Sequence, residues 1–156
     1  MKQKLTLNEA EKIAHSVIDV LKERCQRIEI AGSIRRRKKE VGDIEIVAIP
    51  KYQYDLFGES STVHLLDAFD FSAIGKVIKG GSKYKQIELF DGINLDLFIV
   101  TPPAQWGVVF MIRTGSADFS HRLVTKKQQG GMLPSNLRVE KGAIWSSNHI
   151  IETPEE

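Results

Sequence analysis

The chain has 156 residues, and its 22 Lys and Arg against 20 Asp and Glu give a formal net charge of +2 at pH 7. Apolar residues make up 42% and charged residues 27%, which is ordinary for a globular protein. The single cysteine, Cys25, excludes an internal disulfide, and no apolar run approaches the ~18 residues of a transmembrane helix. We therefore expect a soluble, cytoplasmic monomer that does not bind membranes.

The first two thirds of the chain alternate between helical and strand patterns. A capping box, Thr6-Leu7-Asn8-Glu9, predicts the start of the first helix, and Pro50 ends the second strand. The expected elements, in order, are a helix over 7–25, a strand over 27–31, a helical turn over 33–37, a strand over 43–49, a loop over 50–61, a helix over 61–69, a hairpin of strands 74–78 and 84–89, and a strand over 92–100.

The last third begins after Pro102-Pro103, where the apolar spacing becomes helical. A break at Thr114-Gly115 separates this helix from a second one over 116–128, and a short hairpin pairs 137–139 with 143–145. The sequence therefore predicts an α+β fold with two units. The larger, over 1–101, has a mixed β-sheet with flanking helices, and the smaller α+β unit covers 102–156.

Three acidic residues stand out because they occur inside strand patterns. Asp43 and Glu45 alternate with apolar residues, which places both on one face of a strand about 6–7 Å apart. Asp96 lies between Leu95 and Leu97 in a second strand pattern. A lone pair of this kind is usually a solvated face, but three carboxylates on adjacent strands suit two Mg²⁺ ions and phosphoryl transfer.

A phosphate-binding pattern precedes these carboxylates. Gly32-Ser33 follows a strand-like stretch, so its backbone N–H groups can face a phosphate at the start of a short helix. Arg35, Arg36 and Arg37 then supply planar donors for phosphate oxygens.

In this order of motifs the chain resembles the polymerase beta superfamily of nucleotidyltransferases. Two stretches narrow the resemblance to DNA polymerase family X in a minimal palm-plus-thumb form: Lys79-Gly80-Gly81-Ser82-Lys83-Tyr84 and Arg113-Thr114-Gly115-Ser116-Ala117-Asp118-Phe119. It spans roughly residues 7–150 and implies that 1–101 is a nucleotidyltransferase palm and 102–156 a thumb-like subdomain.

The resemblance also implies roles for individual residues. Asp43, Glu45 and Asp96 would be the catalytic metal ligands for two Mg²⁺ ions, with Mn²⁺ as a substitute, and Asp96 would serve the primer 3′-hydroxyl. Glu45 replaces the commoner aspartate, and Asn94 stands where an arginine often orients the third carboxylate. The implied nucleotide-binding residues are Gly32, Ser33, Arg36, Gly42, Arg113, Thr114, Gly115, Ser116 and Ser120.

Nucleic-acid contacts are implied on two elements. Lys79, Lys83 and Lys85 on the hairpin, and Arg122 and Lys126 on the last helix, would face DNA phosphates. Alternating lysines are also a normal device of a solvated sheet edge. Ile112-Arg113 stands where two aromatics often select the sugar, and Ser120 where an asparagine often contacts the base.

The function that the resemblance implies is template-directed nucleotidyl transfer from a dNTP to a primer 3′-hydroxyl. The substrate would be primer–template or gapped DNA, as in short-gap-filling repair synthesis. Two alternatives stay open: a nucleotidyltransferase of the same superfamily that modifies RNA or a protein, and a non-catalytic nucleic-acid-binding protein with a relic site.

Overall fold

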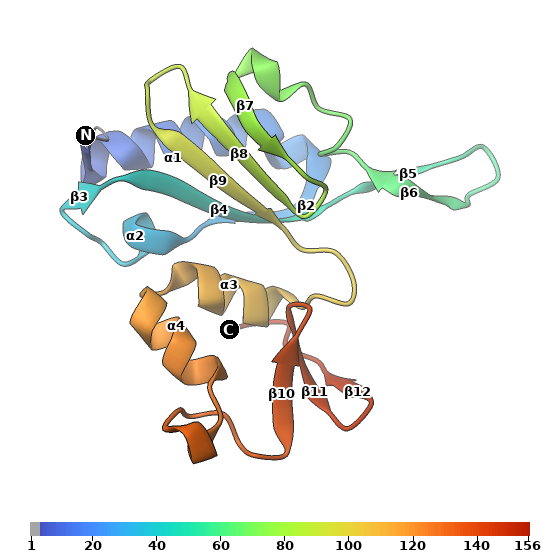
Figure 1. The fold of residues 1–156 in the computed structure, drawn as a ribbon. Coiled ribbons are helices and arrows are strands. Elements are labelled where there is room, and N and C mark those ends of the chain that lie inside the picture. Colours follow the sequence, from blue (N-terminus) through green and yellow to red (C-terminus); the bar gives the residue numbers. More distant parts are fainter. Residues whose placement is uncertain (1–3) are drawn as a thin grey trace.

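A computed structural model of the protein describes residues 4–156, except for the side chains of residues 60–62. Its centre is a mixed five-stranded sheet (Figure 1). β4 and β9 pair in parallel, and the other neighbours are antiparallel. In spatial order the strands are β2 (Cys25–Ile30), β4 (Asp43–Pro50), β9 (Asn94–Ile99), β8 (Tyr84–Leu89) and β7 (Gly75–Gly80).

The two faces of this sheet carry different residues because side chains alternate along each strand. Ile44 and Ile46 of β4 and Leu95 and Leu97 of β9 are fully buried in the larger core cluster, against α1 (Leu7–Leu21). The opposite face carries the carboxylates, so the same alternation that builds the core also exposes the acidic residues.

The helix α1 begins as its sequence predicts. Thr6 and Glu9 form the reciprocal hydrogen bonds of a capping box, with the Thr6 N–H donating to Glu9 Oε2 at 2.9 Å. Its buried residues, Ala10, Ala14, Val17 and Leu21, recur at helical spacing and lie on one face. The predicted helix over 7–25 is shorter here, because residues Lys22–Arg24 form a 3₁₀ turn that leads into β2.

The remaining elements of the first unit are short. A small antiparallel sheet, which the sequence patterns did not predict, pairs β1 (Leu5–Thr6) with β3 (Glu40–Val41). The helix α2 (Gly32–Arg35) corresponds to the predicted turn over 33–37, and a 3₁₀ turn over Phe71–Ala73 precedes β7.

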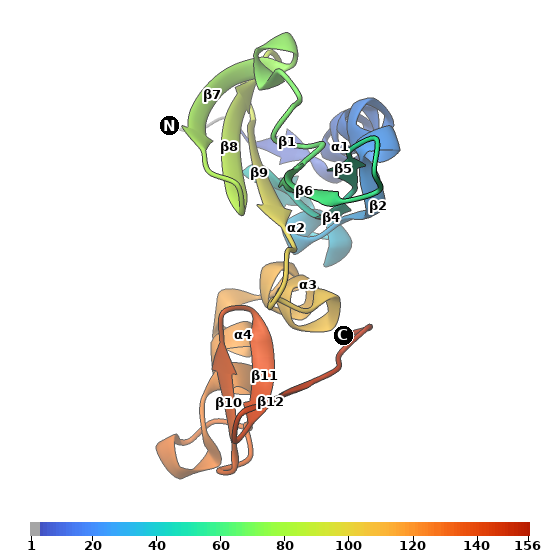
Figure 2. The same ribbon diagram turned by 90° about the vertical axis from the view of Figure 1, so that its right-hand side faces the viewer.

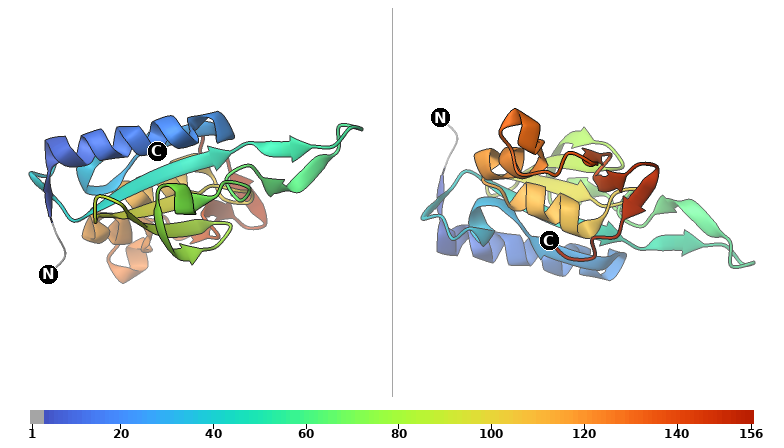
Figure 3. Two further views of the ribbon diagram at one scale, coloured as in Figure 1. Left: turned by 90° about the horizontal axis from the view of Figure 1, so that it is seen from above. Right: turned by 90° about the horizontal axis from the view of Figure 1, so that it is seen from below.

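The prediction of a loop over 50–61 and a helix over 61–69 is wrong. Residues Tyr52–Tyr54 and Ser60–His64 form an antiparallel hairpin, β5–β6, which projects from the side of the molecule (Figures 1 and 3). Tyr52 pairs with His64 across the hairpin, so that backbone polar groups of the two strands are hydrogen-bond partners. The aromatic and β-branched residues of these strands also favour extended structure. The apolar spacing around Leu65 and Leu66 only resembles a helical stripe.

The last third contains two helices and a small sheet. The helix α3 (Trp106–Thr114) lies between the central sheet and the three-stranded sheet (Figure 2). The helix α4 (Ala117–Val124) ends four residues earlier than predicted, and a 3₁₀ turn over Lys127–Gln129 follows. The small sheet consists of β10 (Leu137–Glu140), β11 (Ala143–Ser146) and β12 (His149–Ile151), of which β12 was not predicted.

The helix α3 closes the carboxylate-bearing face of the central sheet at one end. Trp106 and Phe110 form a second core cluster with Val47 and Val100, and Phe98 packs against it. Division of the chain into separate units at residues 101 and 102 stays a prediction, since this cluster draws on both sides of that boundary.

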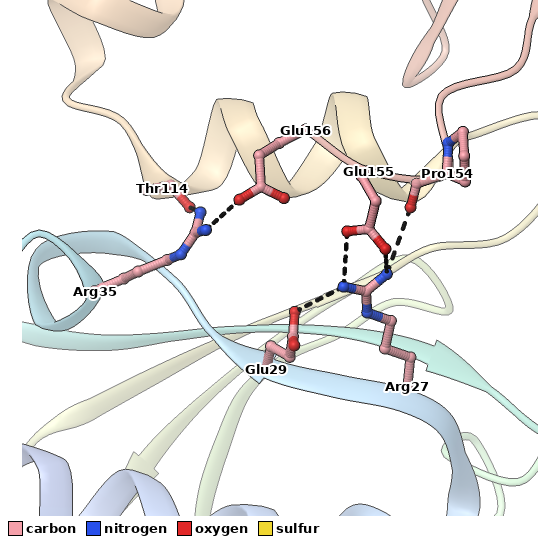
Figure 4. Close-up of polar contacts among 7 residues, drawn as sticks. All are labelled: Arg27, Glu29, Arg35, Thr114, Pro154, Glu155 and Glu156. Carbon is pink, nitrogen blue, oxygen red and sulfur yellow. Dashed lines mark hydrogen bonds and ion pairs between the residues drawn. The ribbon is translucent and has the colours of Figure 1, made fainter.

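Residues 153–156 return to the joint between α3 and β2. Arg27 on β2 donates to both oxygens of Glu155, each at 2.9 Å, and Arg35 pairs with Glu156 (Figure 4). Gly107 donates to the Thr153 carbonyl at 2.8 Å, and a Cβ atom at Gly107 would overlap the Glu155 carbonyl. We call Arg27, Arg35, Glu155 and Glu156 the tail clamp.

The α+β fold with a mixed sheet and flanking helices is therefore confirmed. None of the helices in the described part of the chain combines the length and the apolar character needed to cross a membrane.

Candidate active site

The three predicted carboxylates lie on one face of two adjacent parallel strands. Glu45 of β4 is in register with Asp96 of β9, and Asp43 is in register with Asn94. Because β4 and β9 are parallel, residues in register point to the same side of the sheet. The fold therefore places all three acids side by side on the surface that α3 leaves open.

Asp96 is held in one orientation by the neighbouring strand. Tyr84 Oη and Gln86 Nε2, both from β8, donate to Asp96 Oδ1 at 2.6 and 2.9 Å. Burial, and then the hydrogen bond to Asp96, raise the pKa of Tyr84 to about 12. The phenol therefore stays protonated near neutral pH and remains a hydrogen-bond donor.

Glu45 is turned toward the Gly-Ser turn. Its carboxylate accepts a hydrogen bond from the Ser33 backbone N–H and lies against Gly32, where a Cβ atom would overlap it. Burial first, and then the charge of Asp43, raise the pKa of Glu45 to about 7, against the opposing effect of Arg36. Burial together with the charge of Asp43 thus outweighs the favourable effect of Arg36 on the charged form of Glu45.

These orientations mean that the carboxylate oxygens do not converge on one point. Within residues 4–156, no group of three or more His, Cys, Asp or Glu side chains is arranged to hold a metal ion. Asp96 is directed to β8 and Glu45 to α2, which is the physical reason. The predicted two-metal site stays a prediction.

Two buried polar side-chain atoms on and just after α2, the helix that contains Gly32-Ser33, lack hydrogen-bond partners among the described residues. Ser33 Oγ and Arg36 Nε are both buried without a hydrogen-bond partner among the described residues. The Arg36 guanidinium also donates to the Thr114 carbonyl, which ties α2 to the end of α3. Since a buried unsatisfied donor is unfavourable by about 1–3 kcal/mol, such atoms are typical of a ligand site.

A pocket of about 490 Å³ opens between these groups and α3–α4, and we call it the carboxylate pocket. Its volume is in the range of small-molecule sites. Asp43, Glu45, Arg36 and residues from both helices surround it, the full lining being Arg36, Asp43, Glu45, Ile112, Arg113, Gly115, Ala117, Ser120, His121 and Val124.

Only some of the residues predicted to bind a nucleotide line this pocket. Arg36, Arg113, Gly115 and Ser120 line it, but the Ser120 hydroxyl donates to the Ile112 carbonyl at 2.8 Å. Ser120 is therefore already engaged in packing α4 on α3.

Three other predicted nucleotide-binding residues lie around the joint of α3 and α4 or beside β4. Ser116 caps α4 by accepting from the Phe119 N–H, and the Thr114 hydroxyl accepts from Arg35. Gly42 has open space where a side chain would begin.

The predicted DNA-binding residues divide into exposed and buried ones. Lys79, Lys83 and Arg122 are exposed, and Lys126 is half-buried beyond the end of α4. Lys83 also lines a second pocket, of about 200 Å³, together with Arg113 and Lys141.

Lys85 does not belong to this surface. Its ammonium group donates to Asp67 at 2.8 Å and lies over the ring of Phe71, and the residue is 6% exposed. Placing Lys85 among the DNA-facing lysines is therefore wrong, because it shares the inward face of β8 with Ile87 and Leu89.

The sequence reasoning did not identify Tyr84, Gln86 and Phe98 as parts of the site. The available signal was alternation: Tyr84 and Gln86 share a face of β8, and Phe98 shares one with Asp96 on β9. Arg113, which lines the carboxylate pocket, also covers Phe98: its guanidinium carbon is 4.0 Å from the centre of the Phe98 ring.

The arrangement of the sheet and the helices is similar to that of a solved polymerase beta. Among solved structures, the chain is similar to polymerase beta of Leishmania infantum, determined as a ternary gap complex, with a TM-score of 0.69 and 12% sequence identity. The match covers 94% of this chain and 52% of that one, so this chain spans about half the length of that protein.

Searches by sequence add no relative. No family model matches the chain, and no curated protein matches it. The similarity to polymerase beta is therefore a similarity of fold.

Proposed function

We propose that the protein is a nucleotidyltransferase that adds a nucleotide from a dNTP to the primer 3′-hydroxyl of gapped DNA. The observation that carries the proposal is the pair of unsatisfied buried donors, Ser33 Oγ and Arg36 Nε, close to the acids of the carboxylate pocket. Donors without partners beside clustered carboxylates fit a ligand that is both anionic and accompanied by cations.

The Gly-Ser turn would bind the triphosphate. Phosphate oxygens would accept from Ser33 and from the planar guanidinium of Arg36, which suits them geometrically. The Ser33 N–H now binds the Glu45 carboxylate, so a phosphate would take the place of that carboxylate. The Glu45 side chain would then be free to turn toward the middle of the pocket.

The acidic residues fit divalent cations because they offer hard oxygen ligands. Burial and the charge of Asp43 hold the pKa of Glu45 near 7, which a cation in the pocket would reverse. Asp43 and Glu45 would hold the ion that accompanies the triphosphate, and Asp96 the ion at the 3′-hydroxyl. Two Mg²⁺ ions, or Mn²⁺, supply activation of the hydroxyl and neutralisation of the phosphates.

Gapped DNA is proposed as the acceptor on two grounds. The similar solved structure is a ternary gap complex of a polymerase beta. Basic residues also lie on the β7–β8 hairpin and on or just after α4: Lys79, Lys83 and Arg122 are exposed, and Lys126 is half-buried. These basic side chains would bind the backbone phosphates of a nucleic-acid strand.

The test is a primer-extension assay on a one-nucleotide-gapped duplex with labelled dNTPs and Mg²⁺ or Mn²⁺. We expect the primer to grow by one nucleotide, complementary to the template base, and the product to disappear with EDTA. No extension by the wild-type protein with either metal would contradict the proposal. Extension of an RNA primer or labelling of a protein, with none of the gapped DNA, would favour the other acceptors.

A further inference from the structure

A second, smaller pocket adjoins the carboxylate pocket, and basic side chains from three separate elements line it. Lys83 comes from the turn between β7 and β8, Arg113 from the last turn of α3, and Lys141 from the turn between β10 and β11. Arg113 lines both pockets, so they are neighbours. The smaller one has a volume of about 200 Å³, and apolar side chains such as Phe98 and Val109 form much of its wall. We call it the basic pocket.

The positive charge of the basic pocket is not matched by carboxylates among the described residues. No Asp or Glu of this part of the chain lines the pocket, and neither the Lys83 nor the Lys141 ammonium group forms an ion pair there. Glu140, the acid next to Lys141 in sequence, pairs instead with Arg138 at 3.3 Å. Since like charges repel one another, an anion in this pocket would be favoured.

Backbone hydrogen bonds fix the two turns that carry the lysines. The Lys83 carbonyl accepts from the Ile99 N–H at 2.9 Å, which fastens the β7–β8 turn to the end of β9. The Gly142 carbonyl accepts from the Gln105 N–H at 2.8 Å, and a Cβ atom at Gly142 would overlap Ala104. The β10–β11 turn therefore lies directly against the residues that lead into α3 (Figure 2).

Arg113 adds a donor group whose plane is fixed. Its guanidinium carbon lies 4.0 Å from the centre of the Phe98 ring, and both residues line the basic pocket. A guanidinium that stacks on a ring through its face keeps the N–H groups at its edge, and these groups match phosphate oxygens in geometry.

Lys141 occupies a backbone position that does not favour lysine. Lys141 and Gly142 are the two residues of the β10–β11 turn, because Glu140 pairs with Ala143 on either side of them. Their φ angles are 51° and 74°, as in a type I′ turn, where Asn or Asp followed by Gly is strongly preferred. Since a lysine in the left-handed region weakens the turn, its presence is better explained by the charge that it brings to the pocket.

We propose that the basic pocket binds a single phosphate group, which Lys83, Arg113 and Lys141 hold together. Its volume lies below the roughly 300–1,000 Å³ of ordinary small-molecule sites, so it suits one tetrahedral anion and not a whole nucleotide. The source that fits the proposed function is a backbone phosphate of the gapped duplex, held between the β7–β8 and β10–β11 turns. This source rests on the proposed function, whereas the phosphate chemistry does not.

Lys141→Asn separates binding from folding. Because Asn-Gly is a preferred pair for this turn, the variant should unfold at the temperature of the wild type or higher. Its affinity for a labelled gapped duplex in EDTA should nevertheless fall about fivefold, and the log–log slope of affinity against salt should become shallower by roughly one unit. Lys141→Arg should keep the affinity. Lys12→Gln removes the same charge from the exposed side of α1, across the sheet from the carboxylates, and should change neither quantity.

A scan of the DNA distinguishes one bound phosphate from diffuse attraction. Each backbone phosphate near the gap is replaced in turn by an uncharged methylphosphonate. One linkage should weaken binding by the wild type about fivefold and have no effect on Lys141→Asn, because the two changes remove the same contact. If every linkage weakens both proteins to the same extent, the assignment to a backbone phosphate is wrong.

Inorganic phosphate provides the second arm, without DNA. Added to the free wild-type protein, it should shift the backbone amide NMR signals of Lys83, Arg113 and Lys141, and Lys141→Asn should abolish these shifts. Such shifts without a linkage that depends on Lys141 would uphold the phosphate site and overturn its assignment to DNA. Failure of both probes to respond to Lys141→Asn would overturn the whole proposal. A single dependent linkage in a wild-type protein that extends no primer would support the phosphate site and overturn the proposed polymerase activity.

Discussion

Arg35 and Arg36 are neighbours in sequence, yet they belong to two opposite regions of the molecule. Arg35 is part of the tail clamp: it donates to the Thr114 hydroxyl at 3.0 Å, pairs with Glu156 and covers the Phe110 ring at 4.1 Å. Arg36 faces the carboxylate pocket and keeps a buried Nε without a partner among the residues described. The Arg35 guanidinium thus makes structural contacts within the fold, whereas the Arg36 guanidinium keeps one donor available for a ligand.

The carboxylates of the two regions differ in the same way. Hydrogen bonds from Arg27 and Arg35 hold the pKa values of Glu155 and Glu156 below their ordinary value. In the carboxylate pocket, burial and the charge of Asp43 raise the pKa of Glu45. The clamp therefore pairs each carboxylate with an arginine, which is typical of structural contacts, whereas the pocket holds a buried carboxylate with a raised pKa, which is typical of a binding site.

The largest effect that we expect from the difference between the active-site region and the tail clamp is at Asp96. Asp96→Ala should lower the single-turnover rate of nucleotide incorporation by roughly a thousandfold or more, because a metal ligand supports several kcal/mol of transition-state stabilisation. Binding of dNTP, measured with a fluorescent analogue, should survive, since Ser33 and Arg36 would remain. Retained turnover in Asp96→Ala would remove Asp96 from the reaction.

A matched pair of variants tests the two arginines. Arg36→Ala should slow incorporation about a hundredfold, as expected for one lost donor to developing negative charge. Arg35→Ala should instead lower stability by about 1–2 kcal/mol, from one partly exposed ion pair and one cation–π contact, and Tm by about 2–8 °C. Similar rate losses in both variants would contradict the assignment of Arg36 to ligand binding and of Arg35 to structure.

Stability against pH distinguishes the two kinds of carboxylate by sign. Between the ordinary value of 4.5 and about 7, the folded Glu45 binds more protons than the unfolded one, so this group lowers stability as pH rises through that range. Glu45→Gln should remove the effect and gain about 1–2 kcal/mol relative to the wild type between pH 4.5 and 8, after allowance for screening. Urea unfolding in EDTA measures it.

Glu155→Gln is the control for this measurement. Its pKa is lowered in the folded state by Arg27, so its contribution is present above the ordinary value and is lost as pH falls through the folded pKa. Glu155→Gln should therefore reduce stability at neutral pH and leave it unchanged in acid. If both variants changed the stability at neutral pH in the same direction, the proposed difference between the pocket and the tail clamp would be wrong.

Much of this contrast could be predicted from local sequence. Alternation places Asp43, Glu45 and Asp96 on one face of two strands, and the same rule applied to Lys85 with Ile87 and Leu89 predicts an inward lysine. The mistake at Lys85 was to group residues by charge without asking which face of the strand they occupy.

Contacts between distant segments could not be predicted. The Arg27–Glu155 pair joins residues 128 positions apart, and neither residue carries a local signal for the other. The Tyr84–Asp96 bond requires the register of β8 against β9, which the turn sequence does not fix. His64 lies in a strand because it pairs with Tyr52 across the β5–β6 hairpin. The helix expected over 61–69 could therefore be excluded only once this pairing was known.

The smallest expected effect concerns DNA binding and compares two lysines of one hairpin. Lys83 is exposed beside Arg113 and Lys141, whereas Lys85 is buried against Asp67. If Lys83 contacts a phosphate, Lys83→Ala should make the log–log slope of DNA affinity against salt shallower by roughly one unit. Lys85→Met should lower Tm, because it removes the buried ammonium group that pairs with Asp67, but should keep the slope. Fluorescence anisotropy with a labelled gapped duplex between about 50 and 200 mM salt measures both slopes. An unchanged slope in Lys83→Ala would place Lys83 on a solvated rim, and the proposed path of the DNA would have to avoid the β7–β8 turn.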